Sequence, residues 1–344
     1  MLPSPMTSRD EQFAHALRLE AEGRQDEARR VLAALGDAEA LTALGKNLLA
    51  REPVQSFDGV KAIIDAANGG GAEAAHLCGA MAAVGAGLAQ DWNMALDCLA
   101  AGAERGWQPA RDELALLAAR QGESWKTLRD SIDIDALMAP ATPRTVHEAP
   151  RIAVIERFLT PALCDWLIAR AAPRITRART FASADGAIDR ARNNSDAEFG
   201  FLDLDIALAL IRARIAALTG FPVTGLENTH ILHYATGQRF APHHDFLEVE
   251  RPGAIENIAR WGQRAVTFLV YLNDAFDGAE TAFVKLDWRY RGAKGDAILF
   301  WNLDRDGAVD PLTLHAGLAP SRGEKWLLSQ WIRQAPRAAR PRTS

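Results

Sequence analysis

Residues 239–246 carry two potential metal ligands that are separated by one position. The segment reads RFAPHHDF, with His243 and Asp245 at positions i and i+2. On an extended strand, side chains two positions apart point to the same face, so both can reach one ion while His244 points away. A histidine and an aspartate at this spacing are a weak signal alone, because a third ligand must come from elsewhere in the chain.

A third candidate ligand, His315, lies in the late segment DPLTLHAG. Two imidazoles and one carboxylate on one side of a metal leave neighbouring positions open, and this facial arrangement suits non-haem iron(II). Two open positions can take the keto and carboxylate oxygens of 2-oxoglutarate, and a third can take O2. A zinc hydrolase is an alternative use of the same donors.

Lys325 follows His315 by ten residues, which places it on the next predicted strand, facing the same barrel interior if the register agrees. A buried ammonium group there would pair with the distal carboxylate of 2-oxoglutarate, since an unpaired buried charge is costly. An exposed lysine after a Gly-Glu turn is the alternative interpretation. A zinc hydrolase gives Lys325 no role.

The elements that must position these residues begin at residue 151. RIAVIERFL predicts a strand, Thr160-Pro161 starts a helix over PALCDWLIARA, and residues 203–218 predict a second helix. After Gly220 the pattern predicts a series of strands separated by turns: THILHYA, RAVTFLVYLND, ETAFVKL, DAILFWN, LTLHAG and KWLLSQWI. Two helices followed by many strands predict an antiparallel double-stranded β-helix, that is, a jelly-roll barrel.

Residues 10–130 differ in composition from the strand-rich segment that begins at residue 151. They are rich in Ala, Leu and Glu and have helical periodicity. GDAEALTALG at 36–45 returns as GAEAAHLCGA near 71–80, and Ala40, Ala74 and Ala110 repeat one phase. A period in the mid-thirties predicts an α-solenoid of helical hairpins. The spacing resembles Sel1-like repeats, which are related to tetratricopeptide repeats. Such a region could hold a protein partner or could only stabilise its neighbour.

We therefore expect an α+β protein with four parts. These are a helical repeat domain at 10–130, a Pro-rich linker at 131–150, an oxygenase-type barrel at 151–334 and a basic flexible tail at 335–344. Pro140, Pro143 and Pro150 mark the linker.

The composition narrows the class of protein. The chain has 344 residues, of which 48% are hydrophobic and 24% charged, as is ordinary for a protein that forms a core. Its net charge of −5 argues against a nucleic-acid partner. The N-terminus shows no secretory signal, and no apolar run reaches the roughly 18 residues of a membrane span. Three scattered cysteines fit buried residues in a reducing compartment, so we expect a cytoplasmic enzyme without a membrane partner.

Over about residues 150–334 the sequence resembles the prolyl 4-hydroxylase family of 2-oxoglutarate oxygenases. The matching segments, in the family's order, are PRIAVIERFL, HYATGQRFAPHHDF, RAVTFLVYLND, GAETAF, GDAILFWN, LHAGLAP and GEKWLLSQWI. The resemblance implies that His243, Asp245 and His315 hold iron and act as the catalytic centre, and that Lys325 binds 2-oxoglutarate. It further implies that Tyr234, Thr267 and Tyr271 line the cosubstrate pocket and that Trp331 packs beside metal and substrate.

The chain departs from this family at three places. His230 stands where the family often has Gln. The insert FLEVERPGAIENIARWGQ at 246–263 predicts a loop on the substrate side. The segment 178–201 takes the place of a mobile loop over the site, and we expect Arg190, Arg192 and Asn194 to be candidate substrate contacts there, with a merely solvated loop as the alternative.

The resemblance implies a dioxygenase that hydroxylates a C–H bond and releases succinate and CO2. Its cofactors would be Fe(II), 2-oxoglutarate as cosubstrate and O2, with ascorbate as a further candidate. We expect a prolyl residue in a protein or peptide as substrate, held in part by the helical repeats. A free amino acid or small metabolite is the alternative substrate, and a non-catalytic jelly-roll and repeat interaction protein is the alternative of a different class.

Overall fold

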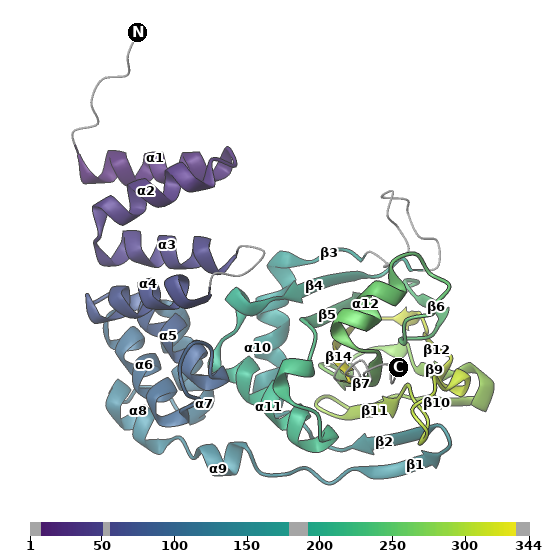
Figure 1. The fold of residues 1–344 in the computed structure, drawn as a ribbon. Coiled ribbons are helices and arrows are strands. Elements are labelled where there is room, and N and C mark those ends of the chain that lie inside the picture. The colour runs from purple at the N-terminus through teal and green to yellow at the C-terminus, as the bar shows by residue number, and fades with distance from the viewer. Residues whose placement is uncertain (1–7, 51–55, 179–191, 335–344) are drawn as a thin grey trace, which may run out of the picture. The chain divides into compact units, whose positions relative to one another are not determined.

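The computed structural model describes residues 8–50, 56–178 and 192–334. Two compact units emerge from the contacts within the chain. The first unit contains the chain up to Met138 together with Phe201–Ile211, and the second contains 139–200 and 212–344. Figure 1 shows helices throughout the first unit and a strand-rich barrel in the second. None of the described helices is long and apolar enough to cross a membrane.

The first unit is built from antiparallel helices. Its elements are α1 (Arg9–Ala21), α2 (Gln25–Leu35), α3 (Ala38–Leu49), α4 (Ser56–Asn68), α5 (Ala72–Val84), α6 (Trp92–Glu104), α7 (Gln108–Ala118), α8 (Trp125–Ser131) and α9 (Ile134–Leu137). Ser8, Asp37 and Asp91 cap the N-termini of α1, α3 and α6 by accepting a backbone N–H. Gly36 and Gly85 end α2 and α5 with a left-handed backbone that glycine adopts without strain.

The sequence repeat corresponds to a structural repeat. Ala40, Ala74 and Ala110 are the third residues of α3, α5 and α7, and all three have no exposed surface. Gly45 and Gly79, which are 34 positions apart, allow a close approach of paired helices. A Cβ on Gly45 would lie 2.7 Å from the Ile63 side chain, and one on Gly79 would lie 2.9 Å from the Ala95 carbonyl oxygen. The predicted helical hairpins are confirmed.

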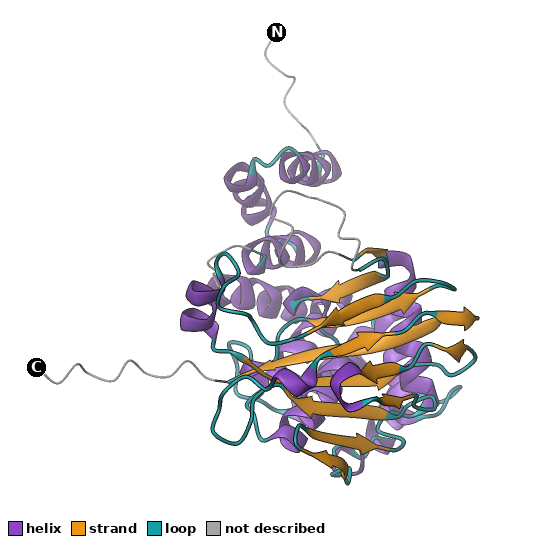
Figure 2. Cartoon of the chain, turned by 90° about the vertical axis from the view of Figure 1, so that its right-hand side faces the viewer, coloured by secondary structure: helices purple, strands orange, loops and turns teal. Residues whose placement is uncertain are grey.

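The second unit contains two sheets in a jelly-roll arrangement, seen broadside in Figure 2. The major sheet has the order β1-β2-β11-β7-β14-β5-β4-β3, the minor sheet the order β10-β9-β12-β6, and β13 pairs with β8. The strands are β1 (Arg144–Glu148), β2 (Arg151–Ile155), β3 (Thr176–Arg177), β4 (Ser195–Phe199), β5 (Thr229–Tyr234), β6 (Phe240–His243), β7 (Arg264–Tyr271), β8 (Asp277–Gly278), β9 (Thr281–Phe283), β10 (Trp288–Tyr290), β11 (Ala297–Trp301), β12 (His315–Gly317), β13 (Pro320–Arg322) and β14 (Lys325–Arg333).

An apolar core lies between the two sheets. Alternating residues of the major sheet, such as Leu232, Leu269 and Ile298, share this core with Phe283 of the minor sheet. The helices of this part of the chain are α10 (Pro161–Ala171), α11 (Ile206–Thr219) and α12 (Ala254–Trp261). Thr160 caps α10 with Pro161 in its first turn, as predicted. The α+β class and the barrel predicted from the strand series are confirmed.

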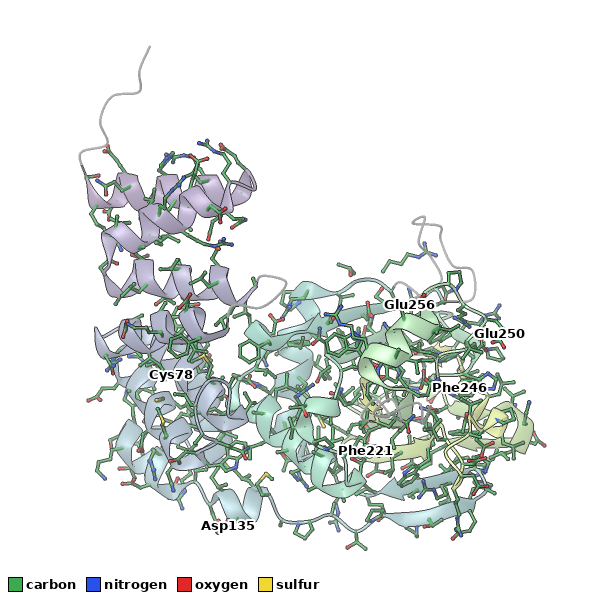
Figure 3. All side chains as sticks on the ribbon, in the orientation of Figure 1. Cys78, Asp135, Phe221, Phe246, Glu250 and Glu256 are labelled. Carbon is green, nitrogen blue, oxygen red and sulfur yellow. The ribbon has the colours of Figure 1, made fainter. Side chains whose placement is uncertain are left out.

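The structure differs from the expected domain plan in three places. Residues 144–148 of the predicted linker form β1, which pairs antiparallel with β2 at the edge of the major sheet. The segment Phe201–Ile211 groups with the helical unit although it follows β4. The insert at 246–263 is not only a loop, because it carries α12; Figure 3 labels its residues Phe246, Glu250 and Glu256.

Candidate active site

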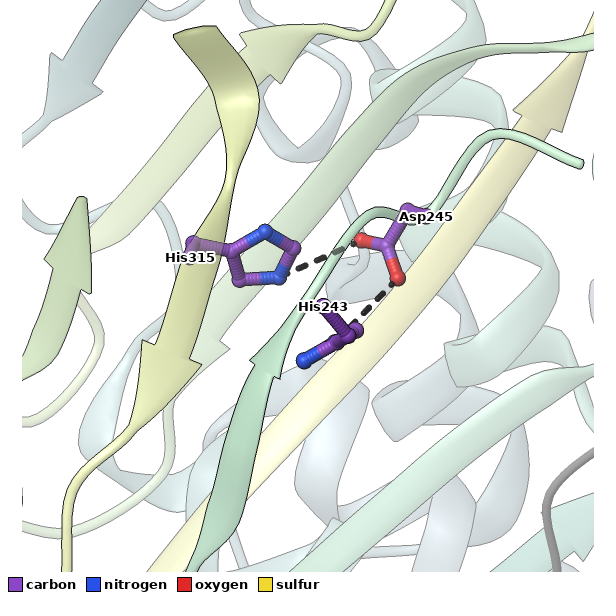
Figure 4. Close-up of side chains that lie close together, drawn as sticks. All are labelled: His243, Asp245 and His315. Atoms are coloured by element: carbon purple, nitrogen blue, oxygen red, sulfur yellow. Dashed lines mark ion pairs between the residues drawn. The ribbon is translucent and has the colours of Figure 1, made fainter. Parts of the chain in front are cut away.

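The two candidate histidine ligands face each other across adjacent strands. His243 ends β6, and His315 begins β12 as its direct cross-strand partner. Asp245 follows β6 by two residues, so its carboxylate returns to the side of the sheet on which His243 lies (Figure 4). One ligand atom from each of the three residues lies within 4.8 Å of the other two, and no other group of His, Cys, Asp or Glu in the described ranges meets this criterion.

Backbone carbonyls orient both imidazoles. Nδ1 of His243 lies 2.8 Å from the Ala241 oxygen, and Nδ1 of His315 lies 3.0 Å from the Thr313 oxygen. Each Nδ1 therefore carries the proton and donates it, which leaves the Nε2 lone pair for a metal. The two Nε2 atoms lie 3.6 and 3.5 Å from the Asp245 carboxylate oxygens. Figure 4 shows both rings directed at this carboxylate.

A chain of neutral donors holds Asp245. The Thr267 hydroxyl donates to Asp245 Oδ2 at 2.7 Å, and the Asn302 amide donates to the Thr267 oxygen at 3.0 Å. Burial alone would raise the pKa of Asp245, but the neighbouring His315 and His243 hold it well below its ordinary value. The carboxylate is therefore ionised at any physiological pH.

The cluster fits iron(II). Burial, followed by the proximity of His243, lowers the pKa of His315 to about 4, so this imidazole is neutral and can donate its lone pair. Two imidazoles and one carboxylate are the donor set of the facial triad, whose remaining coordination positions are open. The outward-pointing His244 is not part of the cluster: it stacks on Phe246, and its ring nitrogens lie near the Pro311 oxygen and Glu248.

Lys325 is a buried cation at the start of β14. It is 1% exposed and pairs with Tyr234 of β5 in the strand register. Its ammonium donates to the Ala279 carbonyl at 2.8 Å and lies over the rings of Tyr234 and Tyr271 at 5.4 and 4.8 Å. Burial lowers the pKa of Lys325 to about 7. An ammonium group whose contacts are a carbonyl and two rings is well suited to an anionic ligand.

One pocket connects the triad with Lys325. It is lined by all three triad residues and by Lys325, Tyr234, Thr281 and Trp331, among others. Burial raises the pKa of Tyr234 to about 12, so its phenol keeps its proton and can donate to an oxygen. The residues therefore fit 2-oxoglutarate, a dianion that needs a metal at its keto acid end and a cation at its distal carboxylate.

Two predicted cosubstrate contacts take other roles. Thr267 is committed to Asp245, as described, and does not line the pocket. The Tyr271 hydroxyl donates to the Tyr290 carbonyl at 2.8 Å and lies 2.9 Å from the Thr281 hydroxyl, and Tyr271 is not among the residues that line the pocket. Each hydroxyl is satisfied by a neighbouring strand that the sequence pattern could not place beside it.

The residues predicted to contact the substrate lie in different environments. Arg190 lies outside the described residues. Arg192 is 5% exposed and lines the pocket. Asn194 is fully buried and lines neither the pocket nor the cleft described below; its Oδ1 accepts from Arg192 Nε at 3.0 Å and so helps to orient Arg192. The Trp331 ring packs on the Arg264 guanidinium at 3.8 Å and borders the pocket.

A cleft of about 610 Å³ lies beside two of the three metal ligands, His243 and Asp245. Its charged side chains occur mainly as ion pairs of opposite sign: Arg264 with Glu227 at 2.7 Å, Arg251 with Glu248 at 2.8 Å and Arg192 with Asp196 at 3.4 Å. His230, the departure from the family's Gln, lies 3.2 Å from the same Asp196 oxygen and next to the Trp331 ring. The charges of the cleft wall therefore largely balance one another.

Three contributors were missed by the sequence reasoning. Asn302 supports Thr267, Phe240 stacks on the His243 ring at 3.6 Å, and Thr281 lines the pocket beside Lys325. Asn302 had a signal, since it is a polar residue directly after the apolar strand AILFW. In the sequence Phe240 and Thr281 show only the pattern of ordinary strand residues.

Comparison with known proteins agrees with this geometry. Residues 229–333 match the 2OG-Fe(II) oxygenase superfamily. Prolyl 4-hydroxylase 1 of Arabidopsis thaliana is 30% identical over 237 residues, which cover 62% of this chain and 82% of the relative.

Two solved structures are also similar to parts of the chain. A viral collagen prolyl hydroxylase from Paramecium Bursaria Chlorella virus-1, solved as a 2OG complex, is 26% identical; the match covers 54% of this chain and 96% of that one, with a TM-score of 0.42. A Sel1 repeat protein from Oxalobacter formigenes is 22% identical over 37% of this chain and 60% of its own, with a TM-score of 0.29.

The His-Asp-His cluster, the buried lysine beside it and the extent of the match to the plant enzyme lead to one conclusion. This chain belongs to the prolyl 4-hydroxylase family of iron(II)- and 2-oxoglutarate-dependent dioxygenases.

Proposed function

We propose that the protein hydroxylates a prolyl residue within a polypeptide. The observation that carries the proposal is a single pocket lined both by the His243–Asp245–His315 cluster and by the buried Lys325. A metal site and a cation in one pocket are the two anchors that 2-oxoglutarate requires. The neighbouring cleft gives the substrate access to the same metal ligands.

The residues divide the work as follows. His243, Asp245 and His315 hold Fe(II), and Thr267 with Asn302 fixes the carboxylate. Lys325 pairs with the distal carboxylate of 2-oxoglutarate, and the Tyr234 phenol donates a hydrogen bond within the same pocket. When bound, the metal, 2-oxoglutarate and O2 supply the oxidant that places one oxygen atom in a C–H bond and the other in succinate, with loss of CO2. Ascorbate is an additive to test beside them.

The charge pattern of the cleft favours a residue within a chain over a free amino acid. A free amino acid carries an ammonium and a carboxylate, and each needs an oppositely charged partner in its site. Three arginines of the cleft face carboxylates of the protein itself. A prolyl residue in a chain has no charge of its own, and its pre-ordered backbone loses little entropy on binding.

In this proposal the helical repeat unit binds the polypeptide substrate. Stacked helical hairpins form extended surfaces that suit chains longer than the residue under reaction. A repeat unit that only stabilises its neighbour is the competing role. Comparing kcat/KM for a short and a long prolyl peptide, both with uncharged flanks, separates the two roles, because a holding surface lowers the KM of the long peptide and a purely stabilising unit does not.

The direct test is product analysis. Purified protein with Fe(II) and 2-oxoglutarate is offered proline-rich peptides and, separately, free L-proline and other amino acids. We expect a mass gain of one oxygen on prolyl peptides with equimolar succinate, and none without iron. Coupled turnover of a free amino acid alone would overturn the peptidyl substrate but leave the dioxygenase assignment intact. Asp245→Ala serves as the inactive control.

A further inference from the structure

The outer face of the minor sheet carries a second depression, on the other side from the triad. In the strand register Phe283 pairs with His315, and both face the barrel interior. The next row consists of Arg289 of β10, Ala282 of β9 and Ala316 of β12, which pair in that order. Because side chains alternate along a strand, this row faces away from the triad.

This row forms the floor of a groove of about 570 Å³. The floor residues are alanines, and the minor sheet is bordered by Arg289 on one side and by Arg239, just before β6, on the other. Alanine side chains are short, so an extended backbone can approach the sheet closely. The groove is therefore shaped for a segment of polypeptide and has a cation near each end.

Arg239 and Arg289 differ from the arginines of the cleft in their exposure and ion pairing. Both are exposed, and no carboxylate in the described part of the chain lies within 4.0 Å of either guanidinium. Asp287 is the acidic residue in the groove lining, and it forms no ion pair with them. The cleft arginines face carboxylates of the protein, whereas Arg239 and Arg289 have no such partner within the described ranges and can bind carboxylates from another molecule.

The groove and the cleft are contiguous. Phe240, Ala241 and Pro242 of β6 line both of them, so β6 is a shared wall. A chain that leaves the cleft over this strand enters the groove directly. From β6 to β10 there are three strand intervals of about 4.8 Å, or about 14 Å. That distance equals about four residues of extended chain, since each spans about 3.3 Å.

We propose that this groove is an exosite that binds an acidic segment of the polypeptide substrate, next to the residue under reaction. Two acidic side chains about four positions apart would reach Arg239 and Arg289 together, with the backbone lying on Ala282 and Ala316. The inference rests on the proposed function, because it requires a polypeptide in the cleft. It adds a sequence preference that the cleft, with its paired charges, does not supply.

The test uses the full chain and matched peptides. Each test peptide has one prolyl core and, on one side of it, two Glu residues four positions apart. Its control peptide has Gln at both of these positions. One pair of peptides carries the charged flank before the prolyl core, and a second pair carries it after the core. We expect a KM for the Glu peptide about three- to tenfold lower on one flank, with kcat unchanged, because two exposed ion pairs are worth about that factor. The Arg239→Gln/Arg289→Gln variant should lose this preference, and 0.5 M salt should weaken it.

The control variant is Arg305→Gln, which removes an exposed arginine outside the groove lining. It should keep the wild-type preference. Equal KM values for Glu and Gln peptides on both flanks in the wild-type protein would overturn the exosite, as would a preference that survives in the double variant. Failure of the exosite and failure of the prolyl assignment are distinguished by a binding experiment that needs no turnover. A fluorescently labelled peptide that carries the two Glu residues but no proline is titrated with the protein, and its anisotropy is measured. Charge-dependent binding that the double variant loses supports the groove even if no prolyl peptide is turned over.

Discussion

His243 and His315 are direct cross-strand partners at the ends of β6 and β12. Their ring centroids lie 4.3 Å apart, and the register of two short strands therefore sets the separation of two metal ligands. The register shifts immediately afterwards, since Gly317 pairs with Phe240, three residues before His243. Phe240 stacks on the His243 ring, with 3.6 Å between the ring centroids.

Removal of either histidine should abolish metal binding without unfolding the barrel. In His243→Ala or His315→Ala, two donors remain, which are too few for a stable site. We expect no detectable Fe(II)-dependent succinate release and no Mn(II) binding by calorimetry, with an unchanged far-UV circular dichroism spectrum. His244→Ala is the matched control, since His244 faces away, and it should bind metal normally. Loss of binding in that variant would refute the strand register at β6.

Thr267→Val should weaken metal binding although Thr267 is not a ligand. The substitution removes the hydroxyl that donates to Asp245 Oδ2 and keeps the shape of the side chain. Loss of such a supporting hydrogen bond typically costs about 10- to 100-fold in metal affinity. Thr267→Ser retains the hydroxyl and should remain near wild type in a Mn(II) titration. If both variants behave alike, the hydrogen bond does not tune the site.

Lys325→Met should raise the stability of the protein and impair 2-oxoglutarate binding. Burial lowers the pKa of Lys325 from 10.5 to about 7, which corresponds to a destabilisation on the order of 5 kcal/mol when the lysine is protonated. Methionine fills a similar volume without a charge. We expect a higher melting temperature without 2-oxoglutarate and a KM for 2-oxoglutarate raised by tens- to thousands-fold. Lys285→Met, at an exposed site, should change neither quantity.

The pH dependence of this effect has a defined sign. Below pH 7 Lys325 is protonated in the folded and the unfolded chain, so its destabilisation is fully present. From pH 7 to 10.5 the folded protein loses this proton first, so wild-type stability rises relative to Lys325→Met. Affinity for 2-oxoglutarate should fall above pH 7, by up to tenfold per unit, in the wild type only. A stability difference that does not change between pH 6 and 9 would contradict this account.

Substitutions at Tyr234 and Tyr271 should change different quantities: the KM for 2-oxoglutarate in the first case and the free energy of unfolding in the second. Tyr234 lines the pocket, so Tyr234→Phe should raise the KM for 2-oxoglutarate and leave the melting temperature nearly unchanged. The Tyr271 hydroxyl contacts Tyr290 and Thr281 instead, so Tyr271→Phe should lower the free energy of unfolding by about 1–3 kcal/mol. Its KM for 2-oxoglutarate should stay at the wild-type value. The reverse pattern in kinetics and denaturation would show that the two assignments are exchanged.

The barrel expressed alone should be unstable. A fragment of residues 146–344 begins inside β1, and it separates Phe201–Ile211 from the helices with which this segment groups. In the whole chain the buried Glu113 carboxylate accepts the Ala207 N–H at 2.7 Å and thereby caps the start of α11. We expect the fragment to aggregate or to melt well below the full chain. A soluble fragment with wild-type uncoupled turnover would contradict this expectation.

Local periodicity made much of this protein predictable from its sequence. The i, i+2 spacing of His243 and Asp245 specifies a shared face on any extended strand, whichever strands lie beside it. The capping pair Thr160-Pro161, the strand series after Gly220 and the recurring Ala40, Ala74 and Ala110 depend likewise on neighbours within a few residues or on a constant repeat.

Only the tertiary structure decided the partners of the polar groups. The hydroxyls of Thr267 and Tyr271 could each serve a ligand or a neighbouring side chain, and cross-strand and cross-sheet packing commits both to protein atoms. Asn194 is turned inward by Arg192 in the same way. Strand pairing brings together residues that are far apart in sequence, and a buried donor takes the acceptor that this pairing supplies. The periodicity of one strand contains no information about its neighbour.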